Sequence, residues 1–581
     1  MMSPDDPMRT VDEVFARIAA SPDPATWIAL RDVEDVRREA AALRDRDRQR
    51  LPLWGVPFGV KDNIDVAGLD TTAACRPFAY RPVADAPVVA RLRAAGALVI
   101  GKTNMDQFAT GLVGVRSPYG MPRCVFDPAH VSGGSSSGSA VAVARGEVAF
   151  ALGTDTAGSG RVPAAFNHLV GVKPTRGLLS TRGVVPACRS LDVISVFATS
   201  CADADLVRRA AQAGDAGDPY SRAARRRPLP LDGLRVGVLA GADRDFNGDD
   251  AAAALYERAI GAVAALGWSA HAIDYAPFRE TAALLYDGPW LAERYAALAE
   301  ALARHGDAVD PTVRRLVEPG ARLSAVDAFR GLHRRAALAA RAATTWAAVD
   351  VLLLPTAPTI PRVDDVLADP IRLNATLGRY TNFVNLLDYC GVAVPAGFRP
   401  DRLPLGVTVI APAFADDDLA VVADRLHRAL VPSAGLACTP LDADTPAGSG
   451  DGGNLRLAVV GAHLSGLPLN HQLTSRDAVL VARTHTAPTY RLHALPGSVP
   501  AKPGMIRVAA GGGAIEVEVW ELTTAAFGSF VAEVPPPLSI GTVMLADGSA
   551  VKGFLCEPAA LAGAEEITHL GGWRAYLAQQ R

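Results

Sequence analysis

The sequence is poor in cysteine and has no large excess of charge of either sign. Its 581 residues contain seven cysteines, an odd number, spread singly along the chain without a CxxC pair. Disulfide scaffolds and structural zinc sites need paired cysteines at suitable spacing, so neither is expected. Reduced thiols, as in the cytoplasm, are the expected state of these cysteines.

Long apolar runs and basic segments are also missing. No run approaches the roughly 18 apolar residues that span a bilayer, and the opening residues MMSPDDPMRT are acidic and lack the apolar stretch of a signal peptide. The net charge of −3 offers no basic surplus for binding nucleic acid without sequence preference. We therefore expect a cytoplasmic protein that binds neither membranes nor nucleic acids.

The composition is otherwise that of a globular protein with more than one domain. Hydrophobic residues make up 49% and charged residues 20% of the chain, which excludes extended disorder and collagen-like repetition. Residues 440–454, PLDADTPAGSGDGGN, are rich in Pro, Gly, Asp and Ser and predict a linker. We expect a large domain over residues 1–439 and a smaller one over residues 455–581.

Short apolar strands alternate with longer helical patterns in the larger predicted domain. Strands are predicted at residues 97–100, 234–239, 349–354 and 407–410, and helices at 28–48, 82–95, 250–266, 290–305, 325–348 and 417–430. This alternation predicts an α/β fold around a buried sheet.

The smaller predicted domain consists mostly of strand patterns. Strands are predicted at residues 455–460, 478–482, 490–495, 505–508, 514–522, 542–545 and 550–555, and a closing helix at 564–577. Asp547-Gly548 between the last two strands is typical of a hairpin turn. We expect a β-rich domain, built as a barrel.

Two short motifs match catalytic patterns but stand in the wrong context. Residues 96–103, GALVIGKT, match the phosphate-loop pattern, which needs its variable residues in a loop, whereas ALVI here is a predicted strand. Residues 134–138, GSSSG, match the nucleophile elbow GxSxG, but the segment before the serines contains Pro128 and two glycines where that elbow needs a strand. We expect neither nucleotide binding nor an α/β-hydrolase triad.

Two loops rich in glycine and serine are the most informative part of the sequence. They occupy residues 133–139 and 153–160 and flank a strongly apolar segment of Ala, Val and Phe. Two solvated flexible loops are the simpler interpretation, but loops pressed against a core usually carry function. Consecutive small residues also let backbone N–H groups point into one anion-binding hollow.

These loops resemble the amidase signature family. The matching residues are GGSSSGSA at 133–140, GTDTAGSGRVPA at 153–164 and, upstream, GVPFGVKD at 55–62. The resemblance covers nearly all of residues 10–435 and implies a large mixed central sheet covered by helices. It also implies a Ser–cis-Ser–Lys catalytic unit, with Ser159 as nucleophile, Ser135 as the bridging serine in a cis peptide and Lys61 as base.

The second loop would also bind the oxyanion that forms during amide hydrolysis. The expected donors are the backbone N–H groups of Thr156, Ala157, Gly158 and Ser159, and such donors contribute about 3 kcal/mol each to the transition state. Asp155 and Arg161, which flank this loop, are interpreted as residues that fix its conformation.

A lysine suits the role of base on chemical grounds, because burial lowers its pKa. Lys61 follows the apolar, tightly turned segment GVPFGV. The alternative interpretation is a surface lysine paired with Asp62. None of the eleven histidines stands in these loops in a triad-like context.

Further segments resemble one branch of the family, the allophanate hydrolases. They are residues 103–120, TNMDQFATGLVGVRSPYG, with 288–295, 380–388 and 460–470. In that branch a Tyr and an Arg eight residues apart hold the substrate carboxylate, and Tyr286 and Arg294 match them. We expect both on one helix, two turns apart. The alternative is a surface arginine paired with Glu293 or Asp287.

Residues 455–581 resemble the C-terminal domain of the allophanate hydrolases, which is similar in fold to γ-glutamyl cyclotransferase. His463 is the candidate there for binding a carboxylate or moving a proton, with His471 as a weaker second. The alternative for His463 is a histidine satisfied by backbone groups at a strand end. The run Gly511–Gly513 is interpreted as a turn rather than an anion-binding nest.

The resemblance implies hydrolysis of the terminal amide of allophanate to ammonia and N-carboxycarbamate, which decarboxylates to further ammonia and carbon dioxide or bicarbonate. No metal or organic cofactor is implied, and a homodimer is expected. A urea carboxylase or a biuret hydrolase would supply the substrate, so service in urea or in triazine and cyanuric acid breakdown stays open. The rival predictions are an inactive scaffold, another amide hydrolase of the family and an amidotransferase-type subunit.

Overall fold

The structure is a computed structural model that describes residues 4–441, 455–476 and 478–580. Most of the predicted linker at 440–454 lies outside the described residues. The chain forms two compact units, and within the described residues the larger comprises 4–224 and 229–441, the smaller 225–228 and 455–580.

The larger unit is built around one eleven-stranded mixed sheet with the strand order β1-β3-β2-β4-β6-β5-β10-β11-β9-β7-β8. The predicted strands at 97–100, 234–239, 349–354 and 407–410 are its strands β3, β7, β9 and β11. The strands are β1 (Trp27–Leu30), β2 (Pro57–Lys61), β3 (Leu98–Thr103), β4 (Phe150–Asp155), β5 (Val170–Lys173), β6 (Val193–Ala198), β7 (Arg235–Val238), β8 (Ser269–Ala272), β9 (Val351–Pro355), β10 (Tyr389–Phe398) and β11 (Pro404–Pro412).

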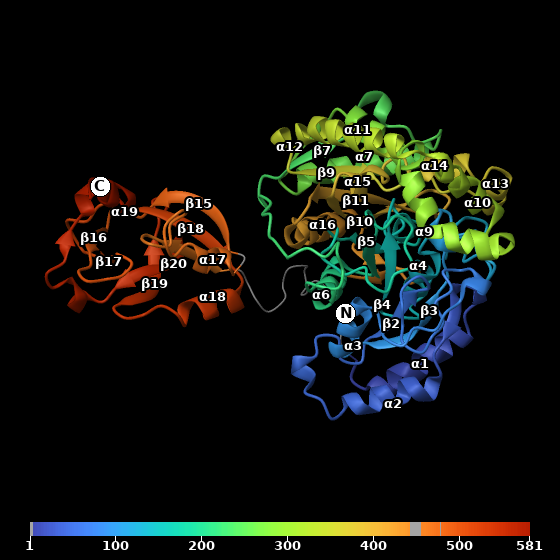
Figure 1. Cartoon of the computed structure of the whole chain (residues 1–581), viewed down its shortest axis with the longest axis horizontal. Helices are drawn as coiled ribbons and strands as arrows, with labels where there is room; N and C mark the ends of the chain where they lie inside the picture. The colour runs from blue at the N-terminus through green and yellow to red at the C-terminus, as the bar shows by residue number, and fades with distance from the viewer. Residues whose placement is uncertain (1–3, 442–454, 477, 581) are drawn as a thin grey trace. The chain divides into compact units, whose positions relative to one another are not determined.

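Helices cover this sheet, as the α/β prediction requires, and Figure 1 shows the strands in the interior of the unit. They are α1 (Pro7–Ala19), α2 (Val33–Leu43), α3 (Pro87–Ala94), α4 (Ser137–Ala144), α5 (Val162–Phe166), α6 (Cys201–Ala211), α7 (Asp250–Ala265), α8 (Ala276–Asp287), α9 (Trp290–His305), α10 (Pro311–Val317), α11 (Ala325–Ala343), α12 (Thr345–Ala348), α13 (Val363–Ala368), α14 (Arg372–Leu377), α15 (Phe383–Leu386) and α16 (Asp416–Leu430). The prediction of one helix over 28–48 is wrong at both ends, because the edge strand β1 precedes α2 and a short 3-10 turn follows it.

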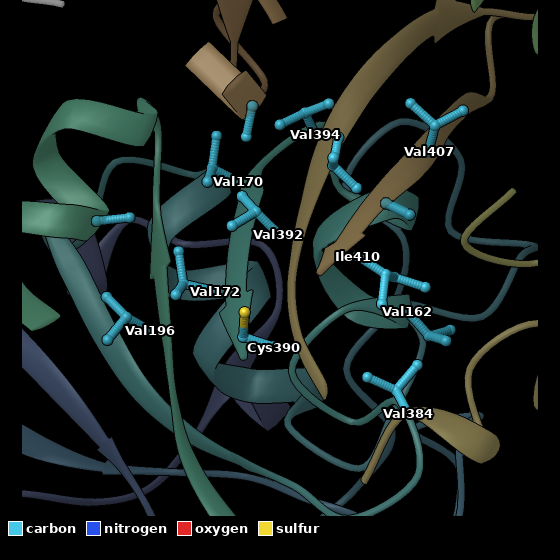
Figure 2. Packing of buried hydrophobic residues seen from close by; sticks show 14 of the residues in the cluster. Val162, Val170, Val172, Val196, Val384, Cys390, Val392, Val394, Val407 and Ile410 are labelled. Atoms are coloured by element: carbon cyan, nitrogen blue, oxygen red, sulfur yellow. The ribbon is translucent and has the colours of Figure 1, made fainter. Parts of the chain in front are cut away.

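The core lies on both faces of the sheet. Strands β2, β3, β4 and β9 are buried at every position, as near-continuous apolar strands of a covered sheet should be. Figure 2 shows β-branched side chains of β5, β10 and β11 packed together, among them Val172, Val392 and Ile410. This packing fixes the positions of the central strands and therefore of the residues at their ends.

The smaller unit is β-rich, as predicted. It contains a five-stranded sheet in the order β15-β18-β14-β20-β19 and a three-stranded sheet in the order β17-β16-β21. Its elements are β14 (Leu455–Val459), α17 (His471–Thr474), β15 (Val479–His485), β16 (Tyr490–Ala494), β17 (Pro503–Arg507), β18 (Glu516–Leu522), α18 (Thr524–Val531), β19 (Leu538–Met544), β20 (Ala550–Cys556), β21 (Glu565–Glu566) and α19 (Trp573–Gln579).

The two edge strands of the five-stranded sheet, β15 and β19, meet at one end. An isolated antiparallel bridge joins Thr486 to Leu545, just beyond the ends of β15 and β19. The closing helix is shorter than predicted: only Trp573–Gln579 is α-helical, because Gly571 adopts a left-handed conformation that ends the preceding 3-10 turn. Among the described residues we find no helix with the length and apolar character needed to cross a membrane.

Candidate active site

The candidate site lies where three neighbouring parallel strands end. Strand β2 pairs in parallel with β3 on one side and with β4 on the other. Lys61 is the last residue of β2 and Asp155 the last of β4. The predicted second loop at 153–160 therefore starts too early, and only residues 156–160 follow the strand as a loop. The carboxyl ends of parallel strands are where open α/β sheets bind their ligands.

Lys61 is fully buried and is held by two neutral hydroxyl groups. Its Nζ donates to Ser135 Oγ over 2.7 Å and to Thr154 Oγ1 over 2.8 Å. Burial lowers the pKa of Lys61 to about 7, although the carboxylates of Asp106, Asp155 and Asp192 oppose this shift. Such a lysine exchanges its proton near neutral pH, which an ordinary surface lysine does not.

Asp62 does not pair with Lys61, so the alternative of an exposed Lys61–Asp62 pair is wrong. Asp62 pairs instead with Lys102, with 3.3 Å between Oδ1 and Nζ, and both side chains are fully buried. Lys102 is the lysine of the misleading phosphate-loop motif. It lies in strand β3, which contains most of the predicted strand ALVI and extends three residues beyond it.

Ser135 is fixed by the loop that follows β3. The Gly134–Ser135 peptide bond is cis, and the carbonyl of Ser135 accepts from the N–H of Asp106 over 3.1 Å. The buried Asp106 carboxylate accepts in turn from the N–H groups of Val113, Gly114 and Arg116.

Ser159 lies on the opposite loop and is 3% exposed. Its Oγ donates to the carbonyl of Gly111 over 3.5 Å. In the part of the chain that the structure describes, it makes no hydrogen bond to Ser135. Contacts within a catalytic group are often long without substrate and shorten only in the reacting complex.

The loop around Ser159 presents three N–H groups without a protein partner among the described residues, those of Thr156, Ala157 and Ser159. The fourth predicted donor differs, because the N–H of Gly158 donates to Asp155 Oδ1 over 3.0 Å. That group is therefore engaged in this structure, and only the other three face no competing acceptor.

Asp155 and Arg161 form a fully buried ion pair beneath this loop. Arg161 donates from Nε and Nη2 to the two carboxylate oxygens over 2.9 and 3.0 Å. Asp155 also accepts from the N–H of Gly160 over 2.9 Å. Burial alone would raise the pKa of Asp155, but the charge of Arg161 holds it below its usual range. The pair therefore fixes the loop by a charged, bidentate clamp.

Asp192 links the Ser159 loop to the segment around Ala187. Its Oδ1 accepts from the hydroxyl of Thr156, and its Oδ2 from the N–H of Ala187 over 2.9 Å. Burial raises the pKa of Asp192 to about 6. Arg294 is a charged neighbour of this carboxylate.

Tyr286 and Arg294 lie together, but on two helices. Tyr286 is in α8 and Arg294 in α9, so the prediction of one shared helix is wrong. The helix breaks at Gly288-Pro289 because proline donates no N–H and disfavours helical geometry in the residue before it. The guanidinium carbon of Arg294 still lies 5.5 Å from the centre of the Tyr286 ring.

Arg294 is buried, 1% exposed, and so is not the surface arginine of the alternative interpretation. Its Nη1 donates to Thr110 Oγ1 over 3.2 Å, and Thr110 directly precedes Gly111, whose carbonyl accepts from Ser159. The Nε of Arg294 has no hydrogen-bond partner in the described part of the chain. The group is therefore close to Ser159 and retains a free donor.

His463 in the smaller unit is packed between aromatic rings. It stacks on Phe554 with 5.0 Å between ring centres and meets the edge of Phe530 at 5.1 Å. Its Nε2 and Gln472 Oε1 are 2.8 Å apart, and burial lowers its pKa. Burial therefore favours the neutral ring, and its Nε2 contacts an amide side chain rather than a backbone group. His471 contacts the carbonyl of Pro468.

Three further residues contact the candidate site and were not singled out from the sequence. Thr154 accepts from Lys61, Asn63 donates to Thr154 over 3.3 Å, and Asp106 fixes Ser135. Each lies in a segment that the family resemblance covers. The sequence patterns offered no reason to choose them, because their contacts join strand ends that are distant in the chain.

Comparison with known proteins gives the family. Residues 9–420 match the amidase family model, and residues 455–578 match the model of the allophanate hydrolase C-terminal domain. The structure is similar to that of Kluyveromyces lactis allophanate hydrolase, with 41% identity, a TM-score of 0.74, and coverage of 100% of this chain and 98% of that chain.

Two curated relatives extend the comparison. Urea amidolyase of Saccharomyces cerevisiae is 42% identical over 98% of this chain, which spans only 32% of that protein's length. The matching subunit of glutamyl-tRNA(Gln) amidotransferase from Symbiobacterium thermophilum is 35% identical over 67% of this chain and 84% of its own. This chain is therefore an amidohydrolase of the amidase family, in the branch that carries the allophanate hydrolase C-terminal domain.

Proposed function

We propose that this chain hydrolyses the terminal amide of allophanate through an acyl-enzyme on Ser159. The observation that carries the proposal is the buried Lys61, with a pKa of about 7 and its Nζ 2.7 Å from Ser135 Oγ. A neutral lysine at that place can accept a proton through one intervening hydroxyl. The K. lactis relative is named an allophanate hydrolase and matches this chain along its full length, which supports the choice of substrate.

In the first step Ser159 Oγ attacks the carbonyl carbon of the terminal amide. Its proton passes to Ser135 Oγ while Ser135 gives its own proton to the neutral amine of Lys61. The carbonyl oxygen becomes an oxyanion, and the N–H groups of Thr156, Ala157 and Ser159 stabilise it. We leave the Gly158 N–H out of this set because it donates to Asp155.

In the second step the C–N bond breaks and ammonia leaves. The leaving nitrogen receives the proton from Lys61 through Ser135, which restores the neutral amine. Water then hydrolyses the Ser159 ester, with the same relay as base, and releases N-carboxycarbamate. This product loses carbon dioxide and yields a second ammonia.

Arg294 and Tyr286 would hold the substrate. A guanidinium group offers a planar pair of donors to a carboxylate, and allophanate carries one carboxylate beside its urea group. The free Nε of Arg294 and the path Arg294–Thr110–Gly111–Ser159 support this placement. We further propose that His463 binds a carboxylate or moves a proton during the decarboxylation.

The test is ammonia release by the purified chain from allophanate, malonamide, biuret and a plain fatty amide. We expect the highest kcat/KM with allophanate. A preference for a neutral amide would contradict the proposed substrate. The rival amidotransferase function rests on relatives that leave a third of this chain unmatched, and ammonia release without transfer RNA would exclude it.

We also propose a cytoplasmic homodimer whose substrate comes from an enzyme that carboxylates urea or hydrolyses biuret. The name urea amidolyase of the yeast relative supports the link to urea. The oligomeric state of the purified protein would test the homodimer. The identity of the neighbouring genes would test the source of the substrate.

A further inference from the structure

A cavity of about 230 Å³ opens next to the candidate active site. Its walls include Arg182, Arg189 and Asp192. Asp192 also accepts from the hydroxyl of Thr156 in the Ser159 loop. Since Ser159 and Arg294 are almost completely buried, a substrate needs an opening of this kind to reach them, and one wall residue of this cavity, Asp192, contacts the Ser159 loop.

The segment that carries Arg189 is bound to helix α9, which carries Arg294. On one side of Arg189, Cys188 Sγ lies 3.5 Å from the carbonyl of Trp290. On the other side, the N–H and hydroxyl of Ser190 donate to the Glu293 carboxylate over 2.6 and 2.7 Å. These contacts hold the exposed Arg189 and the buried Arg294 in a fixed arrangement.

Two arginines line the cavity, and of these only Arg189 lacks an ion-pair partner among the described residues. Arg182 pairs with Asp215, with 3.0 Å between Nε and Oδ2. Arg189 makes no ion pair within the described residues, and its guanidinium carbon lies 5.9 Å from the centre of the Tyr220 ring.

The acidic groups nearby are already occupied. Asp192 accepts from Thr156, from the N–H of Ala187 and from the N–H of Cys188. Asp218 accepts from the N–H and the hydroxyl of Thr181. Among the described residues neither carboxylate forms an ion pair with Arg189, so the Arg189 charge stays available to a ligand that enters the cavity.

We propose that this cavity is the vestibule through which a small carboxylate substrate reaches Ser159, and that Arg189 is a specificity-determining residue that captures the carboxylate before Arg294 binds it. The inference rests on the proposed function. A charge at the rim of a low-dielectric opening raises the local concentration of its counter-ion and so acts on the rate of association.

The test is Arg189→Gln, assayed by ammonia release at low ionic strength. The kcat/KM for allophanate should fall about threefold to tenfold with kcat unchanged, because a rim charge acts mainly on association. At about 1 M salt, where the screening length is about 3 Å, variant and wild type should converge. With malonamide, a neutral amide, the loss should be much smaller.

Three variants serve as comparisons. Arg189→Lys should keep most of the rate, because attraction at a distance needs a charge and not a fork. Arg182→Gln should lose less than Arg189→Gln, since Asp215 already balances that charge. Arg507→Gln removes the same charge from an exposed position in the smaller unit and should behave as wild type.

The proposal is overturned if Arg189→Gln stays within about 1.5-fold of wild type at low salt, or if its loss is the same at high salt or with malonamide. A fall in kcat with unchanged kcat/KM would assign Arg189 to product release and also overturn it. If the wild type releases no ammonia from allophanate, the proposed substrate fails first, and the malonamide data show whether the enzyme is active.

Discussion

The Nζ of Lys61 donates to Ser135 Oγ over 2.7 Å while no part of the Lys61 side chain is exposed. The two residues come from a strand end and a loop that are 74 positions apart in the chain. Three buried carboxylates surround the lysine without forming an ion pair with it. The nearby carboxylates stabilise the protonated form of Lys61, and burial destabilises it. The two forms therefore exchange near neutral pH.

This balance predicts the pH dependence of the reaction. Only the neutral amine accepts a proton, and it becomes the major form as pH rises through about 7. The kcat/KM for allophanate should therefore rise about tenfold per pH unit below that value and level off above it. Lys61→Arg should be inactive across this range, because a guanidinium stays protonated. If Lys61→Ala is slow but keeps the same acid limb, another group is the base.

Ser159→Ala should abolish ammonia release, with a loss of at least about a thousandfold, and leave the fold intact. A fluorophosphonate should label Ser159 in the wild type and in Arg294→Gln but not in Ser159→Ala, as measured by peptide mapping. Ser135→Ala should lose activity to a similar degree because members of a catalytic unit act together. Retained labelling in Ser159→Ala would move the nucleophile to Ser135 or Ser136.

Gly134 is required by the close approach of Asp106. A Cβ at this position would lie 2.0 Å from Asp106 Oδ2 and 2.6 Å from the N–H nitrogen of Gly114, so Gly134→Ala must displace Ser135 or the loop that fixes it. We expect a loss of activity of at least about a hundredfold, since misplacement by about 1 Å has that effect. Gly261→Ala in helix α7 meets no atom within 4 Å and should instead raise stability by about 0.5–1 kcal/mol.

The Asp155–Arg161 pair should be essential for stability. Arg161→Ala leaves a buried carboxylate without its cation, which costs about 3–5 kcal/mol. Urea unfolding followed in the larger unit would measure the change. Arg304→Ala is the matched control, because its pair with Glu300 is 70% and 74% exposed and contributes at most about 1 kcal/mol. Equal effects of the two substitutions would contradict a clamping role for Arg161.

Local patterns in the sequence were sufficient for much of the fold. The strands at 97–100 and 407–410 and the helix at 290–305 appear as β3, β11 and α9 because their apolar spacing matches their burial. Strands β1, β2, β5, β6, β8 and β10 were missed. The edge strand β1 has only four residues, three half-buried and one exposed, which give little periodic signal. The helix predicted at 290–305 begins directly after Gly288-Pro289, a recognised break signal, so Tyr286 should not have been expected on the same helix as Arg294.

For the site, local sequence indicated Lys61, Ser135 and Ser159 through the family resemblance. It gave no indication of Asn63, Thr154 or Asp106. Their roles arise from the alignment of β2, β3 and β4, which brings together side chains from three separate segments. It also could not show that the N–H of Gly158 is engaged, because this depends on the conformation of Asp155.

Arg294 tests the substrate most directly. If Arg294 holds the carboxylate of allophanate in a desolvated pocket, its removal should cost about 2–4 kcal/mol of transition-state binding, or about 30- to 1,000-fold in kcat/KM. A neutral amide never makes this contact, so Arg294→Gln should lose little activity with malonamide. Arg294→Lys should restore only part of the rate, because a point charge cannot reproduce a bidentate fork.

The dependence of activity on salt distinguishes the role of Arg294 from that of Arg189. The contact of Arg294 is buried and direct, so the loss in Arg294→Gln should persist at high ionic strength, where that in Arg189→Gln disappears. Labelling of Ser159 by a fluorophosphonate in Arg294→Gln would show that the nucleophile is still in place. If allophanate turnover by Arg294→Gln stays within about threefold of wild type, roughly 0.6 kcal/mol, another group holds the carboxylate. The substrate would then rest on similarity to the relatives alone.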